Sequence, residues 1–134
     1  MRKHAKGLLL ALATIVSCSS YFVAEYSGVI DHGATELQQK VARFLGDLER
    51  GAANPEFYAE ARGDIQKLRD VASLQRGNDP TVRSLDLIQS NLDKLEAMHA
   101  GGISAKEVDI ARTLLDSQFR MLIQLENAKK RKEG

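Results

Sequence analysis

Apolar side chains return every three or four residues along four segments of this 134-residue chain, and only short links separate the segments. This spacing places the apolar residues of each segment on one face of a helix, and short links force neighbouring helices to run antiparallel. We therefore expect an all-α fold, a small antiparallel four-helix bundle, with helices over residues 34–50, 54–77, 79–99 and 104–130. A helical repeat array is the alternative, but the segments show no self-similarity at a fixed period.

Each segment opens with residues that favour the start of a helix. Ser, Thr, Asn and Asp accept hydrogen bonds from free backbone N–H groups, and Pro fits the first turn. The clearest signal surrounds the last segment, where Ser104 and Glu107 form a capping box, with Ile103 and Val108 as its hydrophobic staple. The other expected starts are Thr35 with Gln38, Asn54 with Pro55, and Asp79 with Pro80.

Cysteine content decides what can hold such a bundle together. The chain has a single cysteine, Cys18, so residues 34–134 contain none. Without disulfides the helical domain must rely on its apolar core.

The first 17 residues have the three parts of an export signal. Arg2, Lys3 and Lys6 precede an apolar run over residues 8–14, and small residues follow it. Residues 15–18 then read Ile-Val-Ser-Cys. This segment resembles the signal of bacterial lipoproteins, in which an aliphatic residue, a variable residue and a small residue precede a cysteine.

The resemblance implies that Cys18 is the site of lipid attachment. In that class the thiol takes a diacylglycerol, the signal is cut before the cysteine, and acyl chains such as palmitate hold the protein on a membrane, where stable anchoring takes more than one chain. The chain then divides into a signal peptide over 1–17, a lipidated cysteine and tether over 18–33, and a helical domain over 34–134. Ser19 follows the cysteine, which by the same resemblance favours the outer over the inner membrane of a bacterial cell envelope, facing the periplasm.

Two alternatives for the N-terminal segment stay open. Residues 7–24 are long enough to be an uncleaved membrane helix, although a serine-rich stretch at 17–20 interrupts them. An ordinary signal peptidase could also cut near Ser19 or Ala24 and release the protein from the membrane.

The expected tether is unusually apolar. Its large apolar residues would lie on the membrane or on the domain's own surface, or help to hold a partner. They are Tyr21, Phe22, Val23, Tyr26, Val29 and Ile30.

The charge of the expected mature chain argues against nucleic acid as a partner. Residues 18–128 carry 12 Lys and Arg against 17 Asp and Glu, whereas nucleic-acid-binding domains carry a basic face. Four further cations are concentrated in residues 129–132. We expect this basic tail to be either a solvated helix end, which the helix dipole favours, or a contact with anionic lipid headgroups.

The sequence contains no recognisable constellation for catalysis or metal binding. His4 falls in the signal, His32 in the tether and His99 at a helix end, and none has a second His or Cys at ligand spacing. His99 is expected to be a half-buried residue or a partner of the helix dipole. We therefore expect a protein that is not an enzyme, with no metal and no cofactor.

The segment 104–130 has an unusually wide apolar face. Its apolar residues cover about 220° of the helix circumference at about 100° per residue, and they form two neighbouring stripes. Either the helix packs centrally against two or three neighbours, or the second stripe is exposed and binds a partner helix or peptide. We expect Leu114 to belong to the core and leave Met121 open. The first stripe is Val108, Ala111, Leu115, Phe119 and Leu122, and the second is Ile110, Leu114, Met121 and Leu125.

These features predict an envelope lipoprotein without enzymatic activity, an accessory or scaffold protein that acts through protein–protein contact. Its partners would be the membrane, through the lipid anchor, and a protein that the sequence does not identify. The alternative is a pilotin-like chaperone lipoprotein that binds a helix or peptide of an envelope protein. The chain resembles pilotins in size, anchor and helix content.

Overall fold

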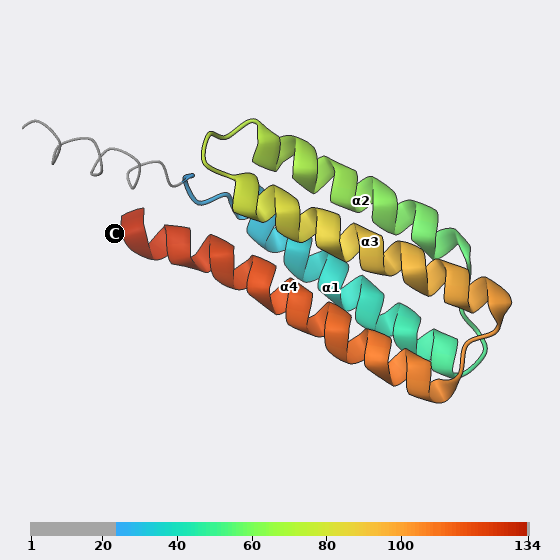
Figure 1. The fold of residues 1–134 in the computed structure, drawn as a ribbon. Helices are drawn as coiled ribbons and strands as arrows, with labels where there is room; N and C mark the ends of the chain where they lie inside the picture. Colours follow the sequence, from blue (N-terminus) through green and yellow to red (C-terminus); the bar gives the residue numbers. More distant parts are fainter. Residues whose placement is uncertain (1–23, 134) are drawn as a thin grey trace, which may run out of the picture.

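The computed structural model describes residues 24–133, and these residues form four helices and no strand. The helices are α1 (Gly28–Glu49), α2 (Glu56–Ser73), α3 (Asp79–Gly101) and α4 (Ala105–Glu133). They lie side by side as one elongated bundle (Figure 1). The all-α fold expected from the apolar spacing is confirmed.

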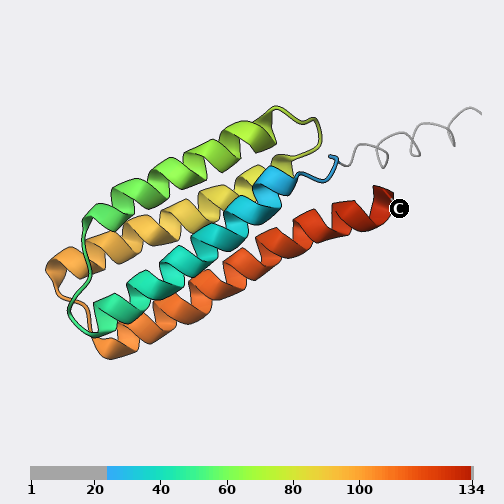
Figure 2. The same cartoon turned by 180° about the vertical axis from the view of Figure 1, so that it is seen from behind.

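Each helix packs against two neighbours in a ring. α1 packs along α2 and α4, and α3 packs along α2 and α4, while the backbones of the two diagonal pairs stay further apart. Across one diagonal, the Phe44 ring of α1 still contacts the His99 ring of α3, with ring centroids 6.1 Å apart. Successive helices run in opposite directions, as the short links require (Figures 1 and 2). The structure is therefore the expected antiparallel four-helix bundle.

Apolar residues from all four helices form one continuous core. In α3 a seam of four leucine and isoleucine residues, spaced by three or four positions, is buried, and so are the five residues of the first stripe in α4. In α2 the buried aromatic residue is Tyr58, whereas its neighbour Phe57 is half-buried. Phe57 instead stacks on Phe44 of α1 with ring centroids 4.0 Å apart. The seam residues of α3 are Leu85, Ile88, Leu92 and Leu95.

The start of α1 differs from the sequence expectation. The helix begins at Gly28, six residues before Ala34, and Ser27 rather than Thr35 is its N-cap. The Ser27 Oγ accepts a hydrogen bond from the backbone N–H of Ile30 at 3.3 Å. Thr35 lies inside the helix, where its hydroxyl donates to the carbonyl of Asp31. Residues 28–33 are therefore part of the bundle, and Ile30 is fully buried in its core.

The link between α2 and α3 is also longer than expected. α2 ends at Ser73, before Gly77, and the N-cap of α3 is Asn78, so that Asp79 and Pro80 occupy the first helical positions. Gly77 lies in the link with φ +83°, a conformation that glycine adopts without strain.

The expected capping box at the start of α4 is confirmed. The backbone N–H of Glu107 donates to Ser104 Oγ at 3.2 Å, and that hydroxyl donates to the Glu107 carboxylate at 2.9 Å. Val108 is buried and Ile103 packs against the core beside it. At α2 the helix begins at Glu56 with Pro55 as its N-cap, one residue later than expected. Asn54 Oδ1 still accepts a hydrogen bond from the backbone N–H of Glu56 at 3.1 Å.

None of the helices between Gly28 and Glu133 combines the length and apolar character needed to cross a bilayer.

Candidate binding surface

The two apolar stripes of α4 have different surroundings. The first stripe is buried between α1 and α3, the only helices that α4 contacts. The second stripe faces outward: Ile110 is 59% exposed, Leu114 44% and Met121 59%. Leu125 is half-buried. The expectation that Leu114 belongs to the core is therefore wrong, because a helix at the corner of a ring has only two neighbours to cover it.

A shallow groove runs between α3 and α4 at this exposed stripe. Its volume is about 260 Å³, and its surface is predominantly apolar. Met98 of α3 faces Ile110 and Leu114 of α4 across it, and Leu95, Ala111 and Leu115 also line it. Three polar residues, Asn91, Lys94 and Glu107, complete its lining.

The apolar surface extends beyond the groove along both helices. Leu87 lies one turn before Asn91 on α3, and Met121 lies two turns after Leu114 on α4. Both side chains are exposed. We call these five exposed residues the α3–α4 strip: Leu87, Met98, Ile110, Leu114 and Met121. Sequence spacing identified its α4 members, but it could not identify the two on α3, which lie outside the buried seam of that helix.

The seam between α1 and α4 has a different character. Gln38 Nε2 donates to Asp116 Oδ1 at 3.0 Å, and Arg112 pairs with Glu49 at 3.0 Å. These cross-helix contacts involve Gln38, Arg112 and Asp116, which line the hollow of about 490 Å³ on that side. Because the polar side chains there already pair with one another, this seam is a weaker candidate for an apolar partner.

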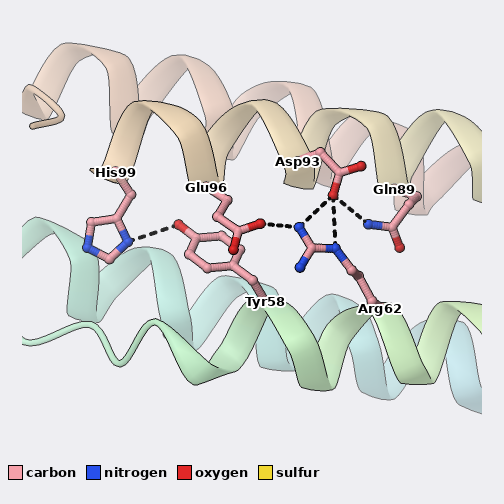
Figure 3. A network of polar contacts seen from close by, with 6 residues as sticks. All are labelled: Tyr58, Arg62, Gln89, Asp93, Glu96 and His99. Carbon is pink, nitrogen blue, oxygen red and sulfur yellow. Dashed lines mark hydrogen bonds and ion pairs between the residues drawn. The ribbon is translucent and has the colours of Figure 1, made fainter. Parts of the chain in front are cut away.

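A polar network joins α2 to α3 on another face of the bundle (Figure 3). The Tyr58 hydroxyl and His99 Nδ1 are 3.1 Å apart, and Arg62 pairs with Asp93 at 2.9 Å and also with Glu96. Burial, with a smaller contribution from Glu96, raises the pKa of Tyr58 to about 12. This shift favours the neutral phenol, which is the form that an ordinary tyrosine also has at neutral pH. The network links α2 to α3 through hydrogen bonds and ion pairs. His99 is half-buried, as expected.

A buried ion pair lies near the end of α4. Lys129 Nζ donates to Glu126 Oε1 at 3.0 Å and to Thr81 Oγ1 at 3.1 Å, and also to Asn78 Oδ1. Glu126 is fully buried and Lys129 nearly so. The first residue of the basic tail is thus an internal contact between α4 and the start of α3. Sequence reasoning missed it, because the two partners at the start of α3, Asn78 and Thr81, lie about 50 residues away in the chain.

The remaining candidates from the sequence take no part in a common site. In the described part of the chain, no group of three or more His, Cys, Asp or Glu is placed to hold a metal ion. His32 is exposed on α1, with its ring 2.7 Å from the carbonyl of Gly28. Cys18, the expected lipid-attachment residue, lies outside the described residues, as do Tyr21, Phe22 and Val23.

Comparison of the chain with protein-family models, curated proteins and solved structures finds no match.

Proposed function

We propose that this protein is a lipid-anchored accessory protein of the bacterial envelope, without enzymatic activity, that binds a partner protein through the α3–α4 strip. The observation that carries the proposal is the exposure of three large apolar residues on α4, beside an apolar groove shared with α3. A contiguous exposed apolar surface rimmed by polar residues is typical of a protein–protein interaction site.

The shape of the strip favours an amphipathic helix as the bound segment. Residues 110, 114 and 121 follow helical spacing, so they form a straight row beside the groove. A partner helix would place its own apolar row, spaced by three, four and seven residues, against this row. Met98 and Met121 add flexible side chains that adapt to the partner's shape.

The lipid anchor is supported by the sequence of residues 1–18. An uncut signal and no lipid are expected for Cys18→Ser, whereas the wild type should incorporate labelled palmitate and migrate as the shorter mature form. Equal palmitate incorporation by both proteins would overturn the anchor.

A single charge in the strip tests the binding role. Glu and Leu have similar helix propensities, so Leu114→Glu should leave α4 folded while placing a carboxylate against the partner's apolar face. We expect this variant, expressed with its anchor intact, to recover much less partner from solubilised membranes than wild type. The matched control is Ala59→Glu, exposed on α2, which does not contact α4. Equal recovery by the two variants would contradict binding at the strip.

The groove also supports the pilotin-like alternative, in which the bound segment belongs to an envelope protein that this chain brings to its membrane as a chaperone. The two roles differ in what happens to the partner. An escorted partner should be lost from its membrane when this chain is deleted or carries Leu114→Glu. A partner of an accessory protein should stay at its normal level in the same membrane.

A further inference from the structure

Three segments that are distant in the sequence meet at one end of the bundle. They are the first described residues, 24–29, the link over 74–78, and the last turns of α4, 129–132 (Figures 1 and 2). Lys129 bonds to Asn78, and Lys130 Nζ lies 5.3 Å from the centre of the Tyr26 ring. We call this surface the Ala24 end.

Exposed cations are concentrated at the Ala24 end. Lys130, Arg131 and Lys132 are exposed on α4, and Arg76 is exposed in the link between α2 and α3. Among the described side chains of these three segments, the one acid is Glu25. Asp79, exposed in the first turn of α3, follows the link directly. The four exposed cations outnumber these two acids, so the surface is net positive, although residues 18–128 as a whole are net negative.

The buried ion pair fixes the position of these cations. Because Lys129 is held by Glu126, Asn78 and Thr81, the helix continues in register through the basic tail. The exposed charges of α4 consequently lie beside the link over 74–78. A frayed tail would spread the same charges over a larger volume, with a weaker local potential.

The most exposed large apolar residue of the bundle lies in the same place. Leu74, at the start of the link, is 87% exposed, and Val29 of α1 is also exposed. An apolar side chain flanked by Lys and Arg is the combination that binds an anionic bilayer, since the cations meet the headgroups while the apolar group enters the boundary of the acyl chains.

The chain also reaches the bundle at this end. Ala24 is six residues from Cys18, and six residues span at most about 20 Å. If Cys18 carries the lipid, as in the proposed function, the Ala24 end is the part of the bundle held closest to the membrane.

We propose that the Ala24 end is a docking surface for anionic phospholipid. This end of the bundle would then contact the bilayer directly, in addition to the attachment through the lipid anchor. The proposal rests on the anchor of the proposed function but not on the α3–α4 strip. Docking would hold the bundle in one orientation relative to the membrane surface.

A single tryptophan tests the docking, because the chain has none of its own. Leu74→Trp is introduced into the full chain and reconstituted in vesicles of equal parts phosphatidylglycerol and phosphatidylcholine, with brominated acyl chains as quencher. We expect a blue-shifted emission that the brominated lipid quenches at least twofold more than in pure phosphatidylcholine vesicles. The matched control is Ala52→Trp, exposed in the link between α1 and α2 at the opposite end.

Charge reversal identifies the cause of any quenching. Lys130→Glu combined with Lys132→Glu should reduce the quenching of the Leu74→Trp chain to the level of the Ala52→Trp control, and so should high salt. Quenching at Leu74→Trp that does not exceed the control would overturn the proposal, and so would quenching that is insensitive to both treatments. Flotation of the same chain with the vesicles reports the anchor separately, and loss of partner recovery in Leu114→Glu reports the strip.

Discussion

Leu114 and Leu115 are neighbours in the chain with opposite surroundings. Leu115 is 1% exposed in the core, whereas Leu114 is 44% exposed beside the α3–α4 groove. The difference comes from a rotation of about 100° between successive residues of a helix. At the residue scale, Leu115 therefore belongs to the core that stabilises the fold, whereas Leu114 belongs to the surface proposed to bind a partner protein.

The two leucines should therefore respond differently to truncation. Leu115→Ala should lower the free energy of unfolding by about 2–5 kcal/mol, because it leaves a cavity in a packed core. Leu114→Ala should lower it by about 1 kcal/mol or less, since the side chain is only half covered. Guanidinium unfolding of the full chain in detergent, followed by circular dichroism, measures both. Equal losses would show that Leu114 is a core residue and that the strip is not an exposed surface.

The Glu126–Lys129 pair is the second feature that depends on single residues. Lys129→Met should cost about 3–5 kcal/mol, because it leaves a buried carboxylate without its counter-ion. Lys129→Met combined with Glu126→Leu should recover most of this loss, since no charge is then buried. The control Lys130→Met, at an exposed position, should change stability by about 0.5 kcal/mol or less. A Lys129→Met variant as stable as this control would contradict the buried pair.

At the scale of the helices, the sequence predicted the regular parts of the fold and missed features that depend on contacts between helices. Apolar spacing is a local property, and it identified the four helices and their buried faces. The early start of α1 was missed because Thr35 with Gln38 indicated a helix start there, and residues 18–33 were expected to be a tether. Gly33 is nevertheless suited to its helix, since a Cβ there would lie 2.5 Å from Leu68 Cδ2 of α2. The spacing of apolar residues along α4 predicts the direction in which each stripe points. Which stripe is buried depends on where α1 and α3 pack against the helix.

The capping box of α4 gives a prediction at this scale. Ser104→Ala should lower the free energy of unfolding by about 1 kcal/mol, because it removes the acceptor for the backbone N–H of Glu107. Ser117→Ala, at an exposed position within the same helix, is the matched control and should be neutral or slightly stabilising. Guanidinium unfolding under the same conditions compares the two. A Ser104→Ala variant no less stable than Ser117→Ala would place the helix start elsewhere.

At the scale of the whole molecule, the two proposed surfaces are separate. The Ala24 end closes one end of the bundle, whereas the α3–α4 strip runs along its side. Ile110 lies about 28 Å along α4 from Lys129 at 1.5 Å per residue. A bundle docked through the Ala24 end would therefore hold the groove away from the lipid, where a partner can reach it.

The partner protein is proposed to bind at the α3–α4 strip, and photo-cross-linking in living cells tests this binding most directly. A photoreactive phenylalanine analogue is placed in the full chain at Ile110 or Met121, both in the strip. The controls carry it at Arg120, exposed on the α1 side of α4, or at Ala59, exposed on α2. We predict one discrete protein adduct, shared by the two strip positions, absent from both controls and lost when Leu114→Glu is added. No adduct from the strip, or the same adduct from all four positions, would contradict the claim.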